Sequence, residues 1–471
     1  MPVTTRPRPR AAAPAAALTL AILVTAGTVH AGGQFLPGHG IRPMGRANTF
    51  VAGGDDVGVL WFNPGGLDLC GNQTLGEAAL LYDHQSYARI DSGGNPQAEV
   101  SSSGDKVPVP TIGAAIQLRR RLTLGLGFSA PYGSIPRFPA DGAQRYSIID
   151  RDGSFLARVD IAASYRIYDG GEDGLRVSLG ASLQDWVANL ESRSVLNACP
   201  GTVTNAPEDP QCDSRTRLQL ETIWNPSAAV GVHARWPRLR LGASFQLPVW
   251  VSGTGKVQAG IPTSPLFRDL DGQPKASQSG DAAVQSLTLP WIVRVGAEYR
   301  ATSRLRFEGE LDIEGWSMSE TVKIQPQNVQ LTNMNGGIPS YQVGDVSIVR
   351  KMRDTFSVRV GGEYDLLPEK LVLRAGFGYE SGSLPNAYIS VLSVDMAKQL
   401  LAVGASWWLH RQWRLDVAYS HVFMNDASVP LSEAAACQVA PIRPATACVP
   451  INAGSYRASY DTFGLGLLYA F

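Results

Sequence analysis

Residues 43–67 read PMGRANTFVAGGDDVGVLWFNPGGL, and the interpretation of the later sequence depends on them. The stretch is rich in glycine, and its apolar residues keep neither a helical nor a strand period for long. A mostly irregular segment of this length has to be enclosed by other structure in a folded protein. Because almost all of the later sequence reads as strands separated by turns and loops, we expect a plug surrounded by a barrel.

The N-terminal residues carry the three regions of a secretory signal peptide. Arg6, Arg8 and Arg10 supply the positive start, residues 11–26 form an apolar run, and residues 29–31 form a small-x-small cleavage site. We therefore expect the signal peptide to comprise residues 1–31. No later segment offers the ~18 apolar residues that a spanning helix needs. An exported soluble protein or a β-barrel remains.

Charge and hydropathy exclude one class of partner but leave the fold open. Lys+Arg and Asp+Glu number 41 each, so no net field favours nucleic acid. The mean hydropathy is close to zero. Soluble globules share that value with outer-membrane barrels, in which lipid-facing apolar residues alternate with polar residues of the lumen.

Alternation of apolar and polar residues is the strongest signal after the plug. It is clear at 239–247 and 305–313, where nearly every second residue is apolar. In a soluble sandwich the apolar face of each strand points inward, and in a membrane barrel it points outward to lipid. The alternation alone therefore does not distinguish the two architectures. We expect fourteen strands, at about 75–90, 107–118, 121–131, 154–167, 174–189, 215–235, 238–252, 286–300, 304–322, 350–365, 370–381, 397–409, 412–424 and 456–471.

The lengths of the connections decide between these architectures. Short turns alternate with long polar links, which fall at 92–105, 132–153, 190–214, 253–285, 323–349, 382–396 and 425–455. Short turns at one rim and long loops at the other are the outer-membrane arrangement. The sequence therefore predicts an all-β protein of the bacterial cell outer membrane: a 14-stranded antiparallel transmembrane β-barrel, residues 75–471, with an N-terminal hatch, residues 32–74, in its lumen.

The last strand supports closure of the barrel. Apolar and aromatic residues alternate with smaller ones from Phe463 to the terminal Phe471. This ending resembles the C-terminal signal by which outer-membrane proteins are recognised, so we expect the barrel-assembly machinery to be a partner. The alternative is an ordinary buried terminal strand.

The cysteines fall in two pairs and one single residue. Each pair flanks one long polar loop, which in an oxidising compartment predicts the local disulfides Cys199–Cys212 and Cys437–Cys448. Neither pair has a CxxC spacing or a nearby histidine, so we expect no metal, and we expect no cofactor. Cys70 is left over, beside the plug.

Taken in order, these stretches resemble the FadL family of outer-membrane transporters for hydrophobic compounds. The plug is similar to the family's N-terminal hatch, except that Gly65 stands where alanine is usual after Asn-Pro. Further similarities cover nearly the whole mature chain: LTLGLGFSAPYG at 122–133, LPWIVRVGAEY at 289–299, EGWS at 314–317, DTFSVRVGGEY at 354–364, LRAGFGYESGSLPNA at 373–387 and FGLGLLYAF at 463–471.

The resemblance implies passive, ligand-gated uptake through a plugged barrel. Substrate would be caught in an apolar groove among the outer loops, pass to an apolar pocket in the lumen, and leave through a gap beside a kinked third strand after the N-terminus moves. The expected substrates are long-chain fatty acids, with monoaromatic hydrocarbons as the alternative. Outer-membrane lipid and lipopolysaccharide would surround the protein, which is expected to be a monomer.

Several residues are candidates for carrying transport. Phe35 and Leu36 would form an apolar stopper, with a loose terminus as the alternative, and Trp61 and Trp250 would line the pocket. The third strand would weaken at its small residues and at a proline that donates no ladder hydrogen bond. The residues involved there are Gly125, Gly127, Ser129 and Pro131.

Other candidates are polar. Asn63 and Pro64 would turn the hatch, while Asp55 and Asp56 would pair with Arg46 or with arginines of the lumen. A carboxylate head group requires a cation, and the same cations at the outer rim would also suit lipopolysaccharide phosphates. The candidates for this contact are Arg193, Arg350, Lys351 and Arg353.

Two other classes of function compete with a transporter. A lipid hydrolase would need a serine and a histidine within hydrogen-bond reach, but the histidines are scattered and no GxSxG motif occurs. A general porin would be an open channel for polar solutes, and the predicted hatch argues against one. We therefore expect a transporter rather than an enzyme.

Overall fold

A computed structural model describes residues 40–471 except 104–105, 132–135, 153, 172, 200–207, 223, 336–339 and 440–447. The predicted stopper, Phe35 and Leu36, lies outside the described residues. None of the helices in the described part of the chain is long and apolar enough to cross a membrane.

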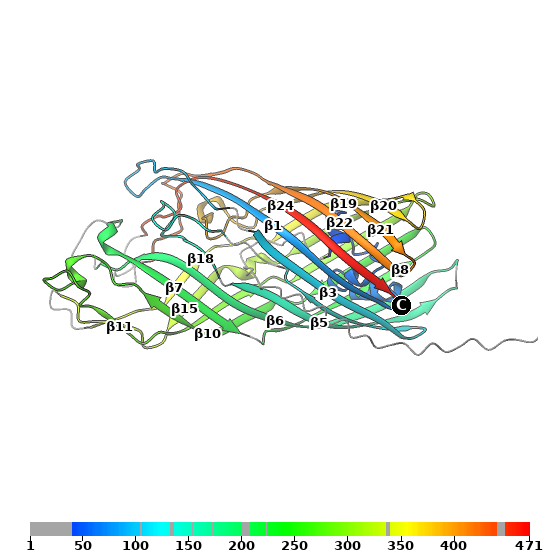
Figure 1. Ribbon diagram of the computed structural model, residues 1–471, viewed down its shortest axis with the longest axis horizontal. Coiled ribbons are helices and arrows are strands. Elements are labelled where there is room, and N and C mark those ends of the chain that lie inside the picture. The colour runs from blue at the N-terminus through cyan, green and yellow to red at the C-terminus, as the bar shows by residue number, and fades with distance from the viewer. Residues whose placement is uncertain are drawn as a thin grey trace, which may run out of the picture.

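The strands form one closed antiparallel barrel of fourteen strands, as predicted (Figure 1). It closes where β1 (Gln73–Arg89) pairs with β24 (Gly454–Ala470) along their whole lengths. The other uninterrupted strands are β3 (Lys106–Arg119), β4 (Leu122–Ser129), β5 (Phe155–Asp169), β6 (Arg176–Asn197), β20 (Leu371–Glu380), β21 (Lys398–His410) and β22 (Trp413–Met424).

Five neighbouring strands are each interrupted once, four of them within a range that the sequence predicted as one continuous strand, whereas β18 lies in a predicted link. Three of the interruptions contain or adjoin Pro226, Pro248 and Pro290, which cannot donate a ladder hydrogen bond. The breaks lie side by side, so this part of the wall has a lower and an upper half. The ten segments are β7 (Asp213–Thr222) with β8 (Pro226–Arg235), β9 (Leu239–Gln246) with β10 (Val249–Ala259), β12 (Ala282–Leu289) with β13 (Ile292–Arg300), β14 (Leu305–Glu314) with β15 (Thr321–Pro326), and β18 (Val346–Val349) with β19 (Thr355–Leu367).

The long-loop end carries additional short elements. Figure 1 shows β11 at this end, opposite the end where the C-terminus lies. A separate small sheet forms there from β11 (Ser277–Ser279), β16 (Gln330–Thr332) and β17 (Ser340–Gln342). The remaining elements are β2 (Val100–Ser101), β23 (Ala427–Val429), η3 (Pro210–Cys212), η4 (Pro265–Phe267), η5 (Trp316–Ser319) and η6 (Asn386–Tyr388).

The two faces of the wall follow the predicted alternation. On β14, Leu305, Phe307, Leu311 and Ile313 are exposed on the outside, whereas the acidic residues between them are buried inside the barrel. The same exposed apolar pattern recurs on β4, β13, β19, β21 and β24. An apolar exterior around a polar interior is the arrangement that a lipid bilayer requires.

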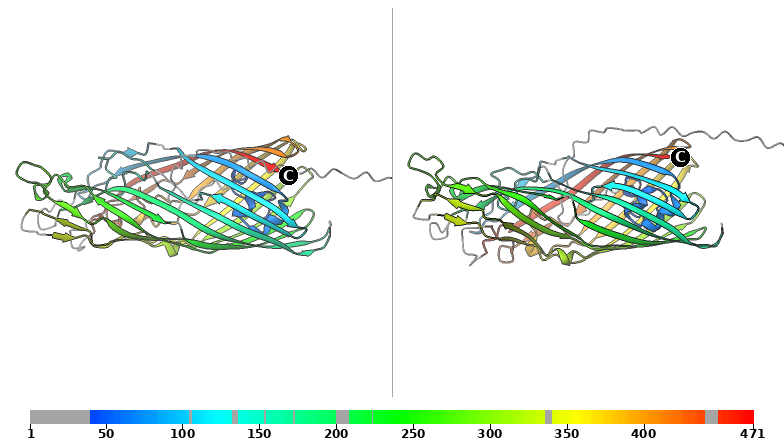
Figure 2. Two further views of the ribbon diagram at one scale, coloured as in Figure 1. Left: turned by 60° about the horizontal axis from the view of Figure 1, so that its bottom comes forward. Right: turned by 90° about the horizontal axis from the view of Figure 1, so that it is seen from below.

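Residues 40–71 lie inside the barrel, toward its short-turn end (Figure 2). They form three short helices, α1 (Ile41–Met44), η1 (Val57–Trp61) and η2 (Pro64–Leu69), and nearly all of their side chains are buried. We refer to residues 40–71 as the hatch segment.

Glycines on the inner wall let the hatch segment pack against the strand backbones. A Cβ at Gly180 would lie 2.3 Å from the carbonyl carbon of Pro64, and one at Gly242 would lie 2.2 Å from the oxygen of Val51. Similar close approaches occur at Gly127, Gly231, Gly361, Gly376 and Gly464. Larger residues at these positions would push the hatch segment off the wall.

Candidate functional site

Charged side chains join the hatch segment to the wall. We call them the hatch network: Arg42, Arg46, Asp55 and Asp56 from the hatch segment, and Arg240, Glu298, Arg306, Glu308, Glu363 and Arg414 from the wall. Most of these side chains are buried. Buried charges are tolerated only when they are paired, so removing one partner is strongly destabilising.

The pairing within the network differs in part from the expected one. Arg42 lies 2.6 Å from Asp55 and 2.9 Å from Asp56, whereas Arg46 reaches wall residues. Its Nη2 lies 3.0 Å from Glu298 and 2.9 Å from Glu308. The prediction that wall arginines meet the two aspartates agrees with the ion pairs of Arg306, Arg240 and Arg414.

Wall carboxylates also accept hydrogen bonds from backbone amides of the hatch segment. Glu310 accepts from the N–H groups of Phe50 and Val51 at 2.8 and 3.1 Å, and Glu308 accepts from Ala52 at 2.7 Å. These amides belong to irregular backbone that has no ladder partner of its own. The acidic inner face of β14 therefore holds the hatch segment by its main chain.

We expect the ion pairs of Asp55 to survive mild acid. Burial opposes charge on Asp55, but attraction to Arg306, Arg42 and Arg240 holds the pKa of its carboxyl well below the usual range. Such a carboxylate contributes stability above its unfolded pKa of about 4 and loses it only as pH falls through the lower folded pKa. Hydrogen exchange of the Asp55 amide at pH 7 and pH 5, corrected for the intrinsic rate, should therefore show equal protection. Loss of protection at pH 5 would contradict this.

The Asn63-Pro64 pair turns the chain between η1 and η2. Asn63 Oδ1 accepts a hydrogen bond from the N–H of Gly65 at 3.0 Å, and Asn63 Nδ2 donates to the carbonyls of Val51 and Val232. Pro64 occupies the first position of η2, where its missing N–H costs nothing. One side chain thus fixes the turn and fastens it to β8.

Gly125 and Gly127 serve the packing of the hatch segment. A Cβ at Gly127 would lie 2.3 Å from Leu60, and one at Gly125 would lie 3.0 Å from Leu67. Both glycines are paired on each side, with β3 and with β5. At these two positions the third strand makes room for hatch side chains, and its pairing is continuous.

Pairing of the third strand stops at Ser129. Residues 106–110 of β3 then pair only with β1, and residues 155–157 of β5 pair only with β6. Among the described residues, which leave out 104–105 and 132–135, no strand pairs between these two segments, and the buried Pro131 lies where β4 has ended. In the described part of the wall, ladder pairing is therefore interrupted just beyond Ser129.

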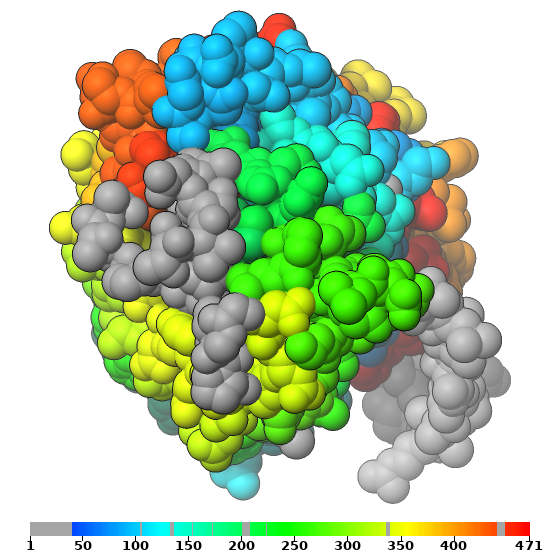
Figure 3. Space-filling model, turned by 90° about the vertical axis from the view of Figure 1, so that its left-hand side faces the viewer, coloured from blue at the N-terminus to red at the C-terminus, as the bar shows by residue number. Residues whose placement is uncertain are grey.

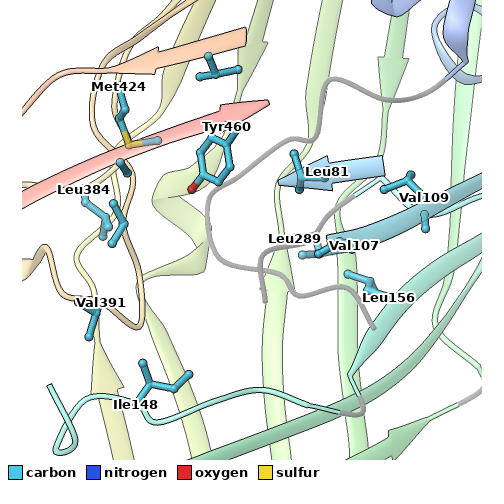
Figure 4. Packing of buried hydrophobic residues seen from close by; sticks show 14 of the residues in the cluster. Leu81, Val107, Val109, Ile148, Leu156, Leu289, Leu384, Val391, Met424 and Tyr460 are labelled. Carbon is cyan, nitrogen blue, oxygen red and sulfur yellow. The ribbon is translucent and has the colours of Figure 1, made fainter. Parts of the chain in front are cut away.

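A large cluster of buried apolar side chains occupies the lumen above the hatch segment. Figure 4 shows side chains from β1, β3, β5, β12, β22 and β24 gathered in this region with residues of the long loops. Trp186 and Trp316 belong to the same cluster and are fully buried. Ion pairs also lie at this level, since Lys398, opposite Met424 in the ladder, is 2.7 Å from Glu380 and 2.6 Å from Asp395. The labelled members are Leu81, Val107, Val109, Ile148, Leu156, Leu289, Leu384, Val391, Met424 and Tyr460.

A pocket of about 250 Å³ lies among the upper strands and long loops. Its walls are mainly aliphatic, and its polar members include Glu191, which is paired with Arg217 at 2.7 Å. Two arginines, Arg151 and Arg350, also line it. The aliphatic lining includes Leu190, Leu196, Leu218, Val257, Leu287, Val322, Ile324, Val343, Ile348, Leu392 and Ile451.

Arg350 and Arg151 are buried cations with no carboxylate at ion-pair distance among the described residues. Arg350 is 6% exposed and donates from Nη2 to the backbone oxygen and Oγ of Ser319 at 3.0 and 2.7 Å, while its Nε has no partner. Arg151 is 7% exposed and donates to the carbonyl of Leu392 at 2.6 Å. Burial and the charge of Arg350 lower the pKa of Arg151 to about 10, so both remain charged at neutral pH.

The other predicted cations are placed differently. Arg193 is paired with Glu191 and Asp150, and Lys351 and Arg353 are exposed outside the pocket. Arg151 escaped prediction because it sits in a long loop, far along the chain from Arg350, with no local signal. Only the folded barrel brings the two together.

The tryptophan predictions do not describe the pocket. Trp61 is buried in a separate cluster of the hatch segment, beside Gly113 and Gly127. Trp250 faces outward and is 63% exposed, so the prediction that it lines the interior is wrong. Successive side chains of a strand point to opposite faces, and on β10 the neighbours Val249 and Val251 point inward. Trp250 between them therefore points outward.

Described parts of the long loops contact one another and the wall at the pocket end, and Figure 3 shows segments from distant parts of the sequence meeting there. Disulfides join Cys199 to Cys212 and Cys437 to Cys448, each within one loop. Arg89, at the end of β1, makes two hydrogen bonds of 2.8 Å to Glu208. This contact joins the loop after β6 to the wall.

Two histidines that are distant in the sequence meet at one carboxylate. His421 Nδ1 lies 2.7 Å and His84 Nε2 lies 3.4 Å from Asp461. All three occupy outward positions of β1, β22 and β24, away from the pocket. The expectation that the histidines are scattered is therefore wrong for this pair, although the pair is not part of the pocket.

Comparisons with known proteins agree with this geometry. A family model described as outer membrane protein transport protein (OMPP1/FadL/TodX) matches residues 22–459. A Pseudomonas aeruginosa FadL homologue of known structure superposes with a TM-score of 0.69 at 16% identity, over 93% of this chain and 99% of the other. The Pseudomonas putida toluene transporter TodX gives 0.62 at 16% identity, with the same coverage.

A relative at the sequence level is outer membrane protein NMB0088 of Neisseria meningitidis serogroup B, strain ATCC BAA-335 / MC58. It is 21% identical over 439 residues, which are 88% of this chain and 91% of the relative. The solved structures support the fold, and the family model covers most of the sequence. The chain therefore belongs to the OMPP1/FadL/TodX family of outer-membrane transport proteins, which carry hydrophobic compounds.

Proposed function

We propose that this transporter takes up long-chain fatty acids, with the carboxylate held by Arg151 and Arg350. The observation that supports this is the pair of buried guanidiniums with no carboxylate at ion-pair distance among the described residues, in a mainly aliphatic pocket. A buried cation without an ion-pair partner is costly, and a bound anion would relieve that cost. A purely hydrocarbon ligand would leave both guanidiniums without an ion-pair partner.

The rest of the ligand would be accommodated by the apolar lumen. Each CH₂ moved from water to an apolar surface gains about 0.8 kcal/mol, so a long acyl chain is drawn from the pocket into the cluster around Leu289 and Met424. That cluster includes Ile41 and Met44 of the hatch segment and Leu190 and Leu287 of the pocket lining, so it connects the two. The lumen is therefore suited to a chain with one anionic end.

Exit would occur through the wall. The hatch network and the amide contacts of β14 hold the hatch segment at the short-turn end, whereas beyond Ser129 no described residues pair between β3 and β5. A hydrophobic ligand leaving there would enter the bilayer and avoid the charged region. Phe35 and Leu36 are proposed to couple ligand binding to this opening, as the predicted stopper.

Uptake of labelled oleate and labelled toluene by a complemented deletion strain tests the proposal. We expect oleate to enter and to compete with other fatty acids, and toluene uptake to match that of cells without the protein. The alternative substrate class, monoaromatic hydrocarbons, is suggested by the likeness to the toluene transporter TodX. Toluene uptake without oleate uptake would establish that alternative.

Oleate binding should show no alkaline titration. Burial and Arg350 lower the pKa of Arg151, but a guanidinium in a protein keeps its proton throughout the accessible pH range. Oleate affinity in detergent, measured by fluorescence titration, should therefore be constant from about pH 7 to 10. A tenfold fall in affinity over this range would contradict a site made of arginines.

A further inference from the structure

The short turns of the barrel carry a set of exposed cations. They lie at the periplasmic end, since the short turns of outer-membrane barrels face the periplasm. Within the described part of the chain, none of them has a carboxylate at ion-pair distance. We call this set the periplasmic cationic rim: Arg119, Arg120, Arg121, Arg238, Arg300, Arg304, Lys370 and Arg411.

The opposite rim is different, because several of its exposed cations are neutralised by neighbouring acids. Arg137 lies 2.6 Å from Asp152 and Arg457 lies 2.9 Å from Glu99. Arg215 lies 2.6 Å from Asp141, and Lys256 lies 3.3 Å from Asp281. Other exposed cations of that rim, such as Lys351 and Arg353, have no carboxylate at ion-pair distance among the described residues. The two rims therefore differ in that the opposite one mixes paired and unpaired cations.

The acidic residues at the periplasmic end do not neutralise the positive charge of the periplasmic cationic rim. Asp169 is already paired with Arg166 and Arg176. Asp173, Asp365 and the exposed Glu369 are confined to two of the turns, between β5 and β6 and between β19 and β20. The turns that follow β3, β8, β13 and β21 carry exposed arginines and no acidic residue.

These cations stand at the edge of the lipid-facing band. Leu118, next to Arg119, is 56% exposed, and Tyr299, next to Arg300, is 42% exposed and packs edge-on against Phe307. Exposed apolar and aromatic side chains at the end of a strand mark the level where hydrocarbon gives way to head groups. Arginine at that level matches phosphate in charge and geometry.

We propose that the periplasmic cationic rim binds the head groups of anionic phospholipids in the inner leaflet and enriches them around the barrel. Cations near a membrane surface attract anionic lipids additively. The charges are distributed around the circumference beside lipid-facing side chains rather than gathered on one flat face. That distribution fits a ring of lipids better than an acidic protein.

The test uses the full chain in phosphatidylcholine vesicles with trace spin-labelled lipids. The ratio measured is the association constant of spin-labelled phosphatidylglycerol divided by that of spin-labelled phosphatidylcholine. For the wild type we expect this ratio to be about five, and to fall toward one in 0.5 M salt because salt screens surface charge. The six-site variant, expected to give a ratio near one, is R119Q/R120Q/R121Q/R238Q/R300Q/R304Q.

A matched control removes cations from the other rim, where they are already paired. The variant R137Q/R215Q/K256Q/R457Q should keep the wild-type ratio, and heat-dependent gel mobility should show that all barrels are folded. A wild-type ratio of one would overturn the proposal, and an acidic protein would then be the better candidate for binding the rim. An equal ratio in wild type and the six-site variant, or an equal loss in the control variant, would overturn it as well.

Discussion

Replacing Arg151 and Arg350 together by glutamine should weaken oleate binding by about 100-fold or more. Each charge-assisted hydrogen bond contributes about 1.5–3 kcal/mol, and 1.4 kcal/mol corresponds to a factor of ten in affinity. Both side chains line the pocket, and neither has a carboxylate at ion-pair distance among the described residues. The single variants should each lose about 30-fold. Fluorescence titration of the purified proteins measures the effect.

The neighbouring cations provide the matched control. Lys351 and Arg353 flank Arg350 in sequence but are exposed outside the pocket. The variant K351Q/R353Q should therefore bind oleate as the wild type does. If both double variants lost affinity equally, general electrostatic attraction would explain the binding and the pocket arginines would have no specific role.

The second large effect is expected at Glu363, the carboxylate of β19 on which the hatch network converges. Arg42, Arg46, Arg306 and Arg374 all contact it, and its side chain is buried. Substitution by leucine leaves these cations without their shared partner, and removing one member of a buried pair costs about 3–5 kcal/mol. We expect E363L to loosen the hatch segment and to increase ion conductance in planar bilayers several-fold.

The exposed pair Arg457–Glu99 offers a comparison for this experiment. Exposed ion pairs contribute about 0–1 kcal/mol, so E99L should conduct like the wild type. Amide exchange of residues 50–52 should accelerate in E363L alone. Unchanged conductance and exchange in E363L would show that the hatch segment is held by packing against the glycines of the wall.

The barrel itself could be predicted from the sequence because its signals are local. The alternation of apolar and polar residues marked each strand. The contrast between short turns and long loops favoured a membrane barrel, with apolar side chains facing outward, over a soluble sandwich. The interruptions were missed where strand-like residues flank Pro226, Pro248 and Pro290, since apolar alternation resumes directly beyond each proline. The alternation of residues predicts which side chains share a face of a strand. It does not predict where the hydrogen bonds of the ladder are broken.

The site was predictable only in part, for a related reason. Arg350 follows a strand and could be assigned to the rim, but its relation to Arg151 depends on how two long loops fold. Trp250 was misplaced because an aromatic residue near a loop suits a pocket and a lipid interface equally well. Its side is set by the register of β10, which pairs through Val249 opposite Leu289.

A crystal structure with a terminally brominated fatty acid would test the central claim most directly. The account predicts the carboxylate within hydrogen-bond distance of Arg151 and Arg350, with the anomalous bromine signal in the apolar lumen near Leu289 and Met424. A bromine signal beside the arginines, or a bound chain with its head group elsewhere, would contradict it.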